Sequence, residues 1–463
     1  MVNPPVPIES TRLAKWSPIL SPASATTALA WDSINAIADS ILKKNYVRAT
    51  KEEVRSPAYF DRTYEEALLY AYLGVAHNDP EWANRATECL NLAIEREAQR
   101  FGYLGIYGGV AGLGWTVEHV SRLLQQITFE ASDEAGAKSN SDSEYGNSED
   151  SDSEDSDLNQ EVDALIIRKI PEMTSSSPYD LISGLAGLGV YFLERLPRES
   201  ASRGMRAVFD QLERLARYEN SGITWFSGPE LLPDWQRKQC PNGYYNLGVA
   251  HGIPGIIHFL SEASVSDAVD PDRVSKLLTG SMDWLIAHAR PKGLASRFSS
   301  WIVPGQDPSD SRMAWCYGDL GILAVLLQVT RRAGRSDWKE FAQEVLDHCL
   351  GWPEEKTGIG DAPLCHGAAG VAHIFNRIYQ QEGDSRCRDA ALMWYEQVLA
   401  MRQPDSGVGG YFSLTRPDPD GPVVWDPSPA FLDGANGVAL ALLAAVTSVD
   451  PGWDRLMLLS GRH

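Results

Sequence analysis

The stretch Arg312–Gly321, R-M-A-W-C-Y-G-D-L-G, shares one pattern with Leu364–Gly370, L-C-H-G-A-A-G. Each places a cysteine two residues before the first glycine of a G-x-x-G unit, and the second adds a histidine beside its cysteine. Cys316, Cys365 and His366 are therefore candidate metal ligands. Two thiolates and one imidazole suit zinc and leave a fourth tetrahedral position open, as in catalytic zinc sites. The cysteines form no C-x-x-C pair, so the prediction depends on the repeat around them.

Six G-x-x-G units recur along the chain, and an apolar stretch of helical period follows each of them. Successive first glycines are 75, 68, 66, 49 and 67 residues apart. This self-similarity indicates an array of helix pairs, in which an inner helix starts at the glycines and an amphipathic outer helix precedes it. Glycine at a helix start lets backbones approach closely and leaves amides free to face a ligand. The units are Gly109–Gly112, Gly184–Gly187, Gly252–Gly255, Gly318–Gly321, Gly367–Gly370 and Gly434–Gly437.

If the helix pairs close into a ring, the residues just before each unit point toward one central opening. The residues immediately before the first glycines are Gly108, Ser183, His251, Tyr317, His366 and Asp433. One place earlier the chain has Tyr107, Ile182, Ala250, Cys316, Cys365 and Leu432. The two candidate cysteines therefore share one register, and His251 and His366 share the other. This agreement favours a common site over coincidence.

Five motifs follow one another along most of the chain. They are Y-D-L-I-S-G-L-A-G-L-G from Tyr179, N-L-G-V-A-H-G-I-P-G from Asn246, W-C-Y-G-D-L-G from Trp315, C-H-G-A-A-G from Cys365 and W-D-R-L-M-L-L-S from Trp453. In this order they resemble the lanthionine synthetase C-like (LanC-like) cyclases. The resemblance implies an all-α fold, an α/α toroid of seven inner and seven outer helices, with one zinc ion at its mouth.

The first repeat is degenerate. A helical pattern over Ala25–Leu42 fits an outer helix, and its inner partner is expected over Tyr64–Val75, although no G-x-x-G unit precedes it. Counting this pair brings the six visible units to seven. The alternative is an N-terminal helical cap outside the ring, because terminal repeats are often atypical.

Length and composition favour one closed toroid domain over residues 1–463. Hydrophobic residues make up 43% of the chain, and the repeat runs through most of it. No apolar run reaches the length of a membrane span, and the N-terminus lacks the features of a signal peptide, so we expect a cytoplasmic protein. Six scattered cysteines do not suggest a disulfide framework. The net charge of -21 argues against a nucleic-acid partner.

Much of the negative charge is local. Residues 130–157 contain eleven Asp or Glu and one Lys. We expect a disordered acidic insertion at 130–160, since like charge and low hydrophobicity keep such a segment solvated. It could dock a basic leader or partner, or it could be a tolerated loop insertion. Deletion of Ser141–Asp157 is expected to leave the melting temperature nearly unchanged.

The chemistry that suits these residues is thiol addition. Zinc stabilises a bound thiolate, whose unperturbed pKa is about 8.5, and makes it a nucleophile near neutral pH. An electron-poor alkene such as dehydroalanine or dehydrobutyrine in a peptide would then form a thioether by conjugate addition. Thiol activation needs a proton acceptor and the resulting enolate needs a proton donor, and a histidine can serve either purpose.

Four residues are candidates for this proton transfer and for charge stabilisation. His251 shares its register with His366, and the resemblance assigns it the acid/base role; the alternative is a helix cap. Asp180 matches the family's carboxylate, which would orient or tune polar groups, or it is an N-cap. Arg312 and Tyr317 match positions near the zinc, where they could stabilise the enolate oxygen. Their alternatives are a surface ion pair and a packed aromatic.

Two loops before the third unit, 222–233 and 239–248, are rich in Gly, Pro and Asn and are expected to rise over the opening.

The sequence thus predicts a zinc-dependent cyclase that adds peptide cysteine thiols to dehydrated Ser or Thr residues, forming lanthionine or methyllanthionine rings. The resemblance places it among stand-alone enzymes of lantibiotic biosynthesis. The implied partners are a dehydrated precursor peptide, a separate dehydratase and an export complex. Alternatives are glutathione addition to dehydroamino acids, or a non-catalytic zinc toroid that binds a peptide or partner enzyme. A carbohydrate-active or terpenoid toroid would need paired carboxylates where Cys and His occur here.

Overall fold

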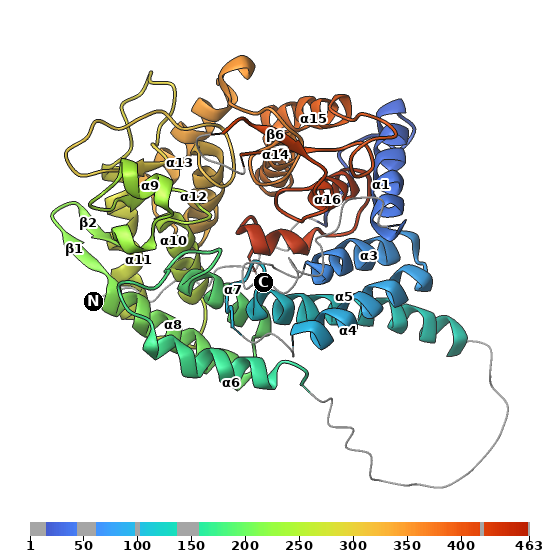
Figure 1. Cartoon of the computed structure of the whole chain (residues 1–463), viewed down its shortest axis with the longest axis horizontal. Helices are drawn as coiled ribbons and strands as arrows, with labels where there is room; N and C mark the ends of the chain where they lie inside the picture. Colours follow the sequence, from blue (N-terminus) through green and yellow to red (C-terminus); the bar gives the residue numbers. More distant parts are fainter. Residues whose placement is uncertain (1–14, 44–61, 98–101, 137–156, 417–420, 462–463) are drawn as a thin grey trace, which may run out of the picture.

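The computed structural model describes residues 15–43, 62–97, 102–136, 157–416 and 421–461. Within these ranges, seven inner helices form a closed ring that seven outer helices surround (Figure 1). The inner helices are α3 (Thr63–His77), α5 (Val110–Gly136), α7 (Leu185–Arg195), α10 (Ile253–Ala263), α12 (Asp319–Ala333), α14 (Ala368–Glu382) and α16 (Ala435–Val446). The outer helices are α1 (Ala25–Lys43), α4 (Pro80–Glu97), α6 (Gln160–Lys169), α8 (Glu199–Leu215), α11 (Pro271–Ala287), α13 (Ser336–Leu350) and α15 (Ser385–Ala400). The predicted all-α, α/α toroid fold is confirmed.

The ring closes between its first and last inner helices. Each inner helix contacts the next one, and α16 contacts α3. The inner helices are apolar almost all round, and every residue of α16 from Ala435 to Ala445 is buried. Outer helices bury one stripe only, as α8 does with Met205, Val208 and Leu212. These two patterns explain why the inner helices can form a wall with protein on both sides.

The sequence analysis predicted that each inner helix pairs with the outer helix before it in the chain, and this prediction is wrong. Helices α3, α7, α10, α12 and α14 each pack more extensively on the outer helix that follows than on the outer helix before. Short connections such as His77 to Pro80 force neighbouring helices into antiparallel hairpins. Helix α1 accordingly packs mainly on α16, not on α3. The long connections, which precede the inner helices, are left to form the mouth.

Among the described residues of these connections, six short strands form three antiparallel pairs. The pairs are β1 (Arg217–Glu219) with β2 (Gly222–Thr224), β3 (Tyr245–Asn246) with β4 (Trp301–Ile302), and β5 (Ser413–Thr415) with β6 (Val424–Asp426). A short helix, α9 (Asp234–Gln239), and 3₁₀ turns η1 (Ile170–Glu172), η2 (Pro229–Leu231) and η3 (Glu354–Lys356) complete the loops.

The second glycine of each G-x-x-G unit allows the loop to lie against the start of the inner helix. A Cβ atom added there would meet the carbonyl oxygen of the residue three places before the first glycine. The separation would be 1.9–2.1 Å in five units and 3.0 Å at Gly255. Real Cβ atoms do not approach an oxygen that closely, so only glycine fits the five tight positions.

The amides at these helix starts are not free, which corrects the expectation that they face a ligand. In the second unit, the amides of Leu185, Ala186 and Gly187 donate to the carbonyls of residues 178–180 in the preceding loop. The amides of Ala368 and Ala369 donate in the same way to Asp361 and Ala362. The helix starts therefore hold the loops in place instead of binding a ligand.

The degenerate first repeat is a true member of the ring. Helix α3 covers the predicted Tyr64–Val75, and side chains replace the missing G-x-x-G loop. The Tyr64 hydroxyl accepts a hydrogen bond from the Gly108 amide (2.7 Å), and Glu65 Oε2 accepts one from the Phe431 amide (2.8 Å). These bonds link α3 to the loops on both sides of it. An N-terminal cap outside the ring is therefore excluded for this helix.

The W-D-R-L-M-L-L-S segment plugs the centre of the ring. It includes the 3₁₀ turn η4 (Gly452–Met457), which lies inside the ring in Figure 1. Trp453 is 1% exposed, and the carbonyls of Leu456 and Met457 accept hydrogen bonds from the Tyr107 hydroxyl and the Trp315 indole (both 2.7 Å). The plug is therefore bonded to the loops that form the mouth.

Two ion pairs fix the plug to the inner helices. Asp454 lies 2.7 Å from Arg377 of α14, and Arg455 lies 2.9 Å from Glu194 of α7. Asp454 and Glu194 are almost fully buried. Breaking such a buried pair by removing one partner costs about 3–5 kcal/mol.

The acidic segment is outside the described residues over 137–156. Helix α5 continues to Gly136 and the described residues begin again at Asp157, so the structure describes both ends of the expected insertion at 130–160 but not its centre. Asp157 lies 2.6 Å from the fully buried Arg195, which holds the pKa of this carboxyl below its usual value. A deletion in the acidic segment that is meant to leave the melting temperature unchanged must therefore keep Asp157.

The close packing at the second glycine of a G-x-x-G unit can be tested by comparing the same position in two units. We expect Gly187→Ala to destabilise the fold by about 1–3 kcal/mol, because its Cβ would overlap the Leu181 carbonyl. Gly255→Ala is the matched control, since the same helix position there has more space. The gain in helix propensity is common to both variants, so the difference in urea unfolding midpoint reports the overlap. Equal midpoints would contradict the proposed packing role.

Candidate metal centre and active site

A ladder of backbone hydrogen bonds runs around the mouth of the toroid. Its members are the residues two places before the first glycine of successive units, and each amide donates to the carbonyl of the corresponding residue in the next unit. The bonds are Tyr107 to Ile182 (3.3 Å), Ile182 to Ala250 (3.3 Å), Ala250 to Cys316 (3.5 Å), Cys316 to Cys365 (3.2 Å) and Cys365 to Leu432 (2.9 Å). The ladder explains why the two cysteines in this register are neighbours in space.

The three predicted metal ligands come together on this ladder. One candidate ligand atom from each of Cys316, Cys365 and His366 lies within 4.8 Å of the other two. In the described part of the chain this is the one such cluster of three or more His, Cys, Asp or Glu side chains. Tetrahedral zinc holds its ligand atoms roughly 3.3–3.8 Å apart, as its bond lengths require, so a small contraction would complete the site. The donor set and the spacing both fit zinc.

The cluster also favours one thiolate. Hydrogen bonding from Cys365 and His366 lowers the pKa of Cys316 well below its usual value, while the same pairing raises the pKa of Cys365. Burial acts to lower the pKa of His366, but the bond to Cys316 and the charge of Asp361 raise it to about 9. The ring of His366 lies between two carboxylates, with Nε2 3.6 Å from Asp361 and Nδ1 3.8 Å from Asp433.

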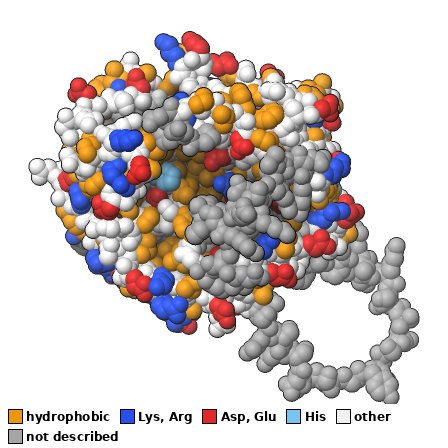
Figure 2. All heavy atoms as spheres, in the orientation of Figure 1, with side chains coloured by type: hydrophobic (Ala, Val, Ile, Leu, Met, Phe, Trp, Pro, Cys, Tyr) orange, Lys and Arg blue, Asp and Glu red, His pale blue; other side chains and the backbone are white. Residues whose placement is uncertain are grey.

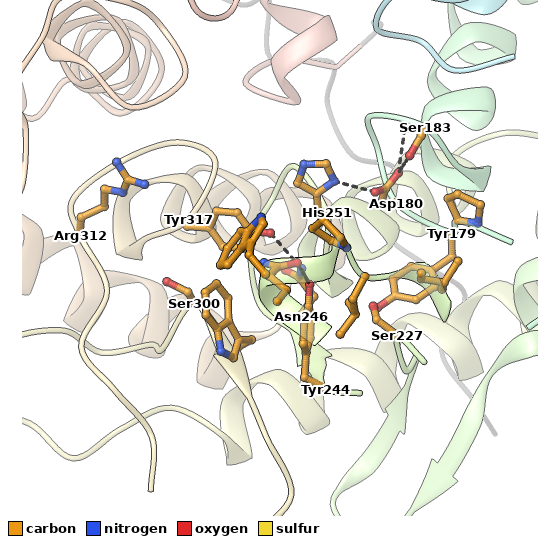
Figure 3. A pocket seen from close by; sticks show the side chains of 17 residues that line it. Tyr179, Asp180, Ser183, Ser227, Tyr244, Asn246, His251, Ser300, Arg312 and Tyr317 are labelled. Atoms are coloured by element: carbon orange, nitrogen blue, oxygen red, sulfur yellow. Dashed lines mark hydrogen bonds and ion pairs between the residues drawn. The ribbon is translucent and has the colours of Figure 1, made fainter. Parts of the chain in front are cut away.

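A cavity of about 520 Å³ opens beside the cluster. In the space-filling view this face is hollowed, and hydrophobic, acidic and histidine side chains are exposed within the hollow (Figure 2). All four predicted catalytic residues line the cavity: Asp180, His251, Arg312 and Tyr317 (Figure 3). Tyr317 follows Cys316 directly, so the cavity and the metal ligands share one loop.

His251 and Asp180 form a hydrogen-bonded pair in this cavity. His251 Nδ1 lies 2.7 Å from Asp180 Oδ2, and 43% of the histidine side chain is exposed. Burial acts to lower the pKa of His251, but the bond and the charge of Asp180 outweigh it and raise the pKa above 6.5. Asp180 Oδ1 accepts from the Ser183 amide (2.8 Å) and hydroxyl (3.0 Å). The capping and orienting roles of Asp180 therefore coexist.

Tyr317 faces His251 across the cavity, with their ring centroids 6.2 Å apart. Its hydroxyl oxygen accepts a hydrogen bond from Asn246 Nδ2 (3.0 Å), which leaves the hydroxyl proton available to donate. Burial raises the pKa of Tyr317, so the proton is retained. Arg312 forms no ion pair with any described residue, so the alternative of a surface ion pair is excluded within the described ranges.

The sequence analysis missed several residues of the site. Tyr244, Trp301 and Asn246 line the cavity, and the expected loop 239–248 does supply part of its wall. A signal for the polar members was present six places before the first glycine, where successive units carry Asn246, Arg312 and Asp361. The register one place before the glycine likewise contained Asp433, which touches His366.

The structure thus defines an α/α toroid whose mouth combines a Cys/Cys/His cluster with a histidine–aspartate pair. The family model described as lanthionine synthetase C-like protein matches residues 66–458, and the chain belongs to this family.

Two relatives and one solved structure show the range of similarity. The chain is 24% identical over 382 residues to the nisin biosynthesis protein NisC of Lactococcus lactis subsp. lactis, covering 76% of this chain and 77% of the relative. It is 25% identical over 181 residues to the glutathione S-transferase LANCL1 of Danio rerio, covering 38% of this chain and 40% of that protein. The structure of a nisin cyclase superposes with a TM-score of 0.68 at 18% identity, over 92% of this chain and 98% of the other.

Within the described ranges, no helix is both long and apolar enough to cross a membrane. The division into a single domain over 1–463 stays a prediction.

The His251–Asp180 pair can be tested by titration. We expect Asp180→Asn to lower the pKa of His251, because the variant removes the negative charge that stabilises the imidazolium. The measurement is a histidine NMR titration against pH. Ser183→Ala is the control: it removes one hydrogen bond to Asp180 but keeps the charge, so the pKa should stay above 6.5. An unchanged pKa in Asp180→Asn would contradict the coupling.

Proposed function

We propose that this protein is a zinc-dependent peptide cyclase. It would add cysteine thiols to dehydroalanine or dehydrobutyrine by conjugate addition, forming (methyl)lanthionine rings in a ribosomally made peptide. The observation that carries the proposal is the Cys316, Cys365 and His366 cluster, which shares one mouth with the His251–Asp180 pair. Family membership and the similarity to a nisin biosynthesis protein support the same chemistry.

The three ligands would hold one zinc ion and leave one position for the substrate thiol. Bound zinc supplies a lowered thiol pKa, so that a nucleophilic thiolate is present near neutral pH. Main-chain bonds on the ladder hold the backbone of Cys316 and Cys365, which would keep these two ligands at a fixed place beside the cavity.

His251 would move the protons. Because its Nδ1 bonds to the Asp180 carboxylate, the neutral tautomer carries its proton on Nδ1 and its lone pair on Nε2. Nε2 can then accept the proton of the substrate thiol. The sulfur adds to the β-carbon of the dehydro residue, and the same proton returns from Nε2 to the α-carbon of the enolate. Thiol and alkene are consumed without any oxidant, and the enzyme is restored.

Tyr317 and Arg312 would stabilise the negative charge that develops on the enolate oxygen. The Tyr317 hydroxyl can donate because Asn246 already occupies its acceptor side. Arg312 reaches the cavity with no described ion-pair partner, so its charge is available to a substrate oxygen. Such preorganised donors contribute on the order of 2–4 kcal/mol each to transition-state stabilisation.

The cavity favours a peptide chain over glutathione. Among the described residues that line it, Arg312 is the one arginine or lysine, whereas glutathione carries two carboxylates. The similarity to the glutathione transferase of Danio rerio spans 38% of this chain, against 76% for the nisin protein. We therefore place peptide cyclisation first and glutathione addition second. A cytoplasmic location, a separate dehydratase that prepares the peptide, and an export complex remain parts of this proposal.

Zinc binding is the first test. We expect one zinc per chain by elemental analysis of the purified protein, and its loss in the Cys316→Ala, Cys365→Ala double variant. A Cys349→Ala, Cys387→Ala double variant is the matched control, because these buried cysteines lie on the outer helices α13 and α15 and not on the loops of the mouth. Metal retained at the wild-type level without Cys316 and Cys365 would refute the site.

The acid/base role of His251 is tested separately from zinc. His251→Asn should keep the zinc yet lose cyclisation by about 10²–10⁴-fold, because the metal ligands remain while the group that accepts the thiol proton and returns it to the enolate is lost. The assay is alkylation of the free cysteines of a dehydrated peptide. His366→Asn is the contrasting variant and should lose both zinc and activity. Full cyclisation by zinc-replete His251→Asn would exclude the role.

A further inference from the structure

The candidate ligand His366 has a buried carboxylate partner that the chemistry above does not use. Asp361 is 2% exposed, and its Oδ2 lies 3.6 Å from His366 Nε2. Its other oxygen, Oδ1, is buried and has no hydrogen-bond partner among the described residues. A buried carboxylate of this kind is costly unless a nearby group carries or receives positive charge.

Asp361 differs from most buried carboxylates of the described chain. An arginine lies within ion-pair distance of each of the others that fix helices to one another: Glu118, Asp163, Glu194, Glu262 and Asp454. The one cationic partner of Asp361 at this distance, within the same described ranges, is His366. The position is therefore not explained by the ion pairs that hold the ring together.

The backbone holds this carboxylate firmly in place. The Leu414 amide of β5 donates to Asp361 Oδ2 (2.9 Å), and the Asp361 carbonyl accepts from the Ala368 amide at the start of α14 (2.9 Å). Asp361 thus connects the loop that carries Cys365 and His366 to the β5–β6 hairpin. Its side chain cannot turn away from His366 without breaking the bond to β5.

The second carboxylate beside His366 is placed differently. Asp433 lies 3.8 Å from Nδ1, on the opposite side of the ring from Asp361, and 45% of its side chain is exposed. An exposed carboxylate can turn toward solvent, so its ion pair contributes little free energy. The two neighbours of His366 therefore offer a buried, fixed group and an exposed, movable one for comparison.

We propose that Asp361 is the positioning residue of the metal centre: it accepts a hydrogen bond from His366 Nε2–H and so turns Nδ1 toward the two cysteine sulfurs. Histidine ligands commonly donate their second ring proton to a carboxylate, which fixes the tautomer and strengthens the metal bond. The positive charge of the metal also compensates the buried carboxylate. The inference rests on the proposed zinc site and adds the residue that orients it.

The test is the zinc affinity of the purified full chain, measured by competition with a chromophoric chelator. Asp361→Asn keeps the size of the side chain and an oxygen for the Leu414 amide, but removes the charge. We expect about 10- to 100-fold weaker zinc binding, and a changed visible spectrum of the cobalt-substituted protein. Asp433→Asn should weaken zinc binding by less than the Asp361 variant does.

Asp454→Asn controls for loss of stability alone. Asp454 also forms a buried carboxylate–histidine contact, with His373 Nε2 at 2.9 Å, but it belongs to the central plug. We expect it to lower the melting temperature and leave zinc affinity unchanged. If Asp361→Asn does not fold, Asp361→Glu replaces it, because that variant keeps the charge and displaces the carboxylate by one methylene.

Wild-type zinc affinity and an unchanged cobalt spectrum in the folded Asp361 variant would overturn the inference. Equal losses in the Asp361 and Asp454 variants would do the same, since they would reflect stability rather than positioning. Absence of zinc from the wild-type protein would instead overturn the proposed metal site from which the inference starts. The failures of the two proposals are thus distinguishable.

Discussion

The backbone ladder at the mouth is the interaction on which the rest of the site depends. It forms only if every loop lies against its own inner helix at one fixed height, and the second glycine of each unit permits that approach. Once the height is fixed, residues at the same distance from the glycine become neighbours although they are far apart in sequence. The metal cluster follows from this constraint, because Cys316 and Cys365 occupy adjacent positions on the ladder.

The ladder alone would leave a hollow ring, and the plug fills it. Trp453 and its neighbours bury apolar surface against the inner helices, while Asp454 and Arg455 pair with charges that face the centre. The hydrogen bonds from Tyr107 and Trp315 reach the plug from the loops beside the ladder. The plug that fills the centre of the ring thus also supports the loops of the mouth.

Much of the fold and site could be predicted because, in a repeat, residues at the same distance from each glycine unit occupy equivalent positions in the ring. The shared registers of Cys316, Cys365, His251 and His366 were visible from the glycines alone. Asp361 shares a register with Asn246 and Arg312, but its proposed role could not be predicted, since that role depends on the amide of Leu414 and on burial, and neither leaves a mark in one sequence. The pairing of outer helices was also hidden: periodicity identifies a helix but does not say which neighbour covers it.

The site divides its work between fixed and exposed groups. Cys316 is 6% exposed and main-chain bonds hold both cysteines, so the sulfur position is set by the backbone. His251 directly follows the ladder residue Ala250, yet 43% of its side chain is exposed, so its ring can be reached from the cavity. The proposed conjugate addition would need a sulfur held in place and a proton that leaves and returns. A rigid ladder that holds the buried cysteines and places the exposed histidine near them would meet the two requirements with a single backbone arrangement.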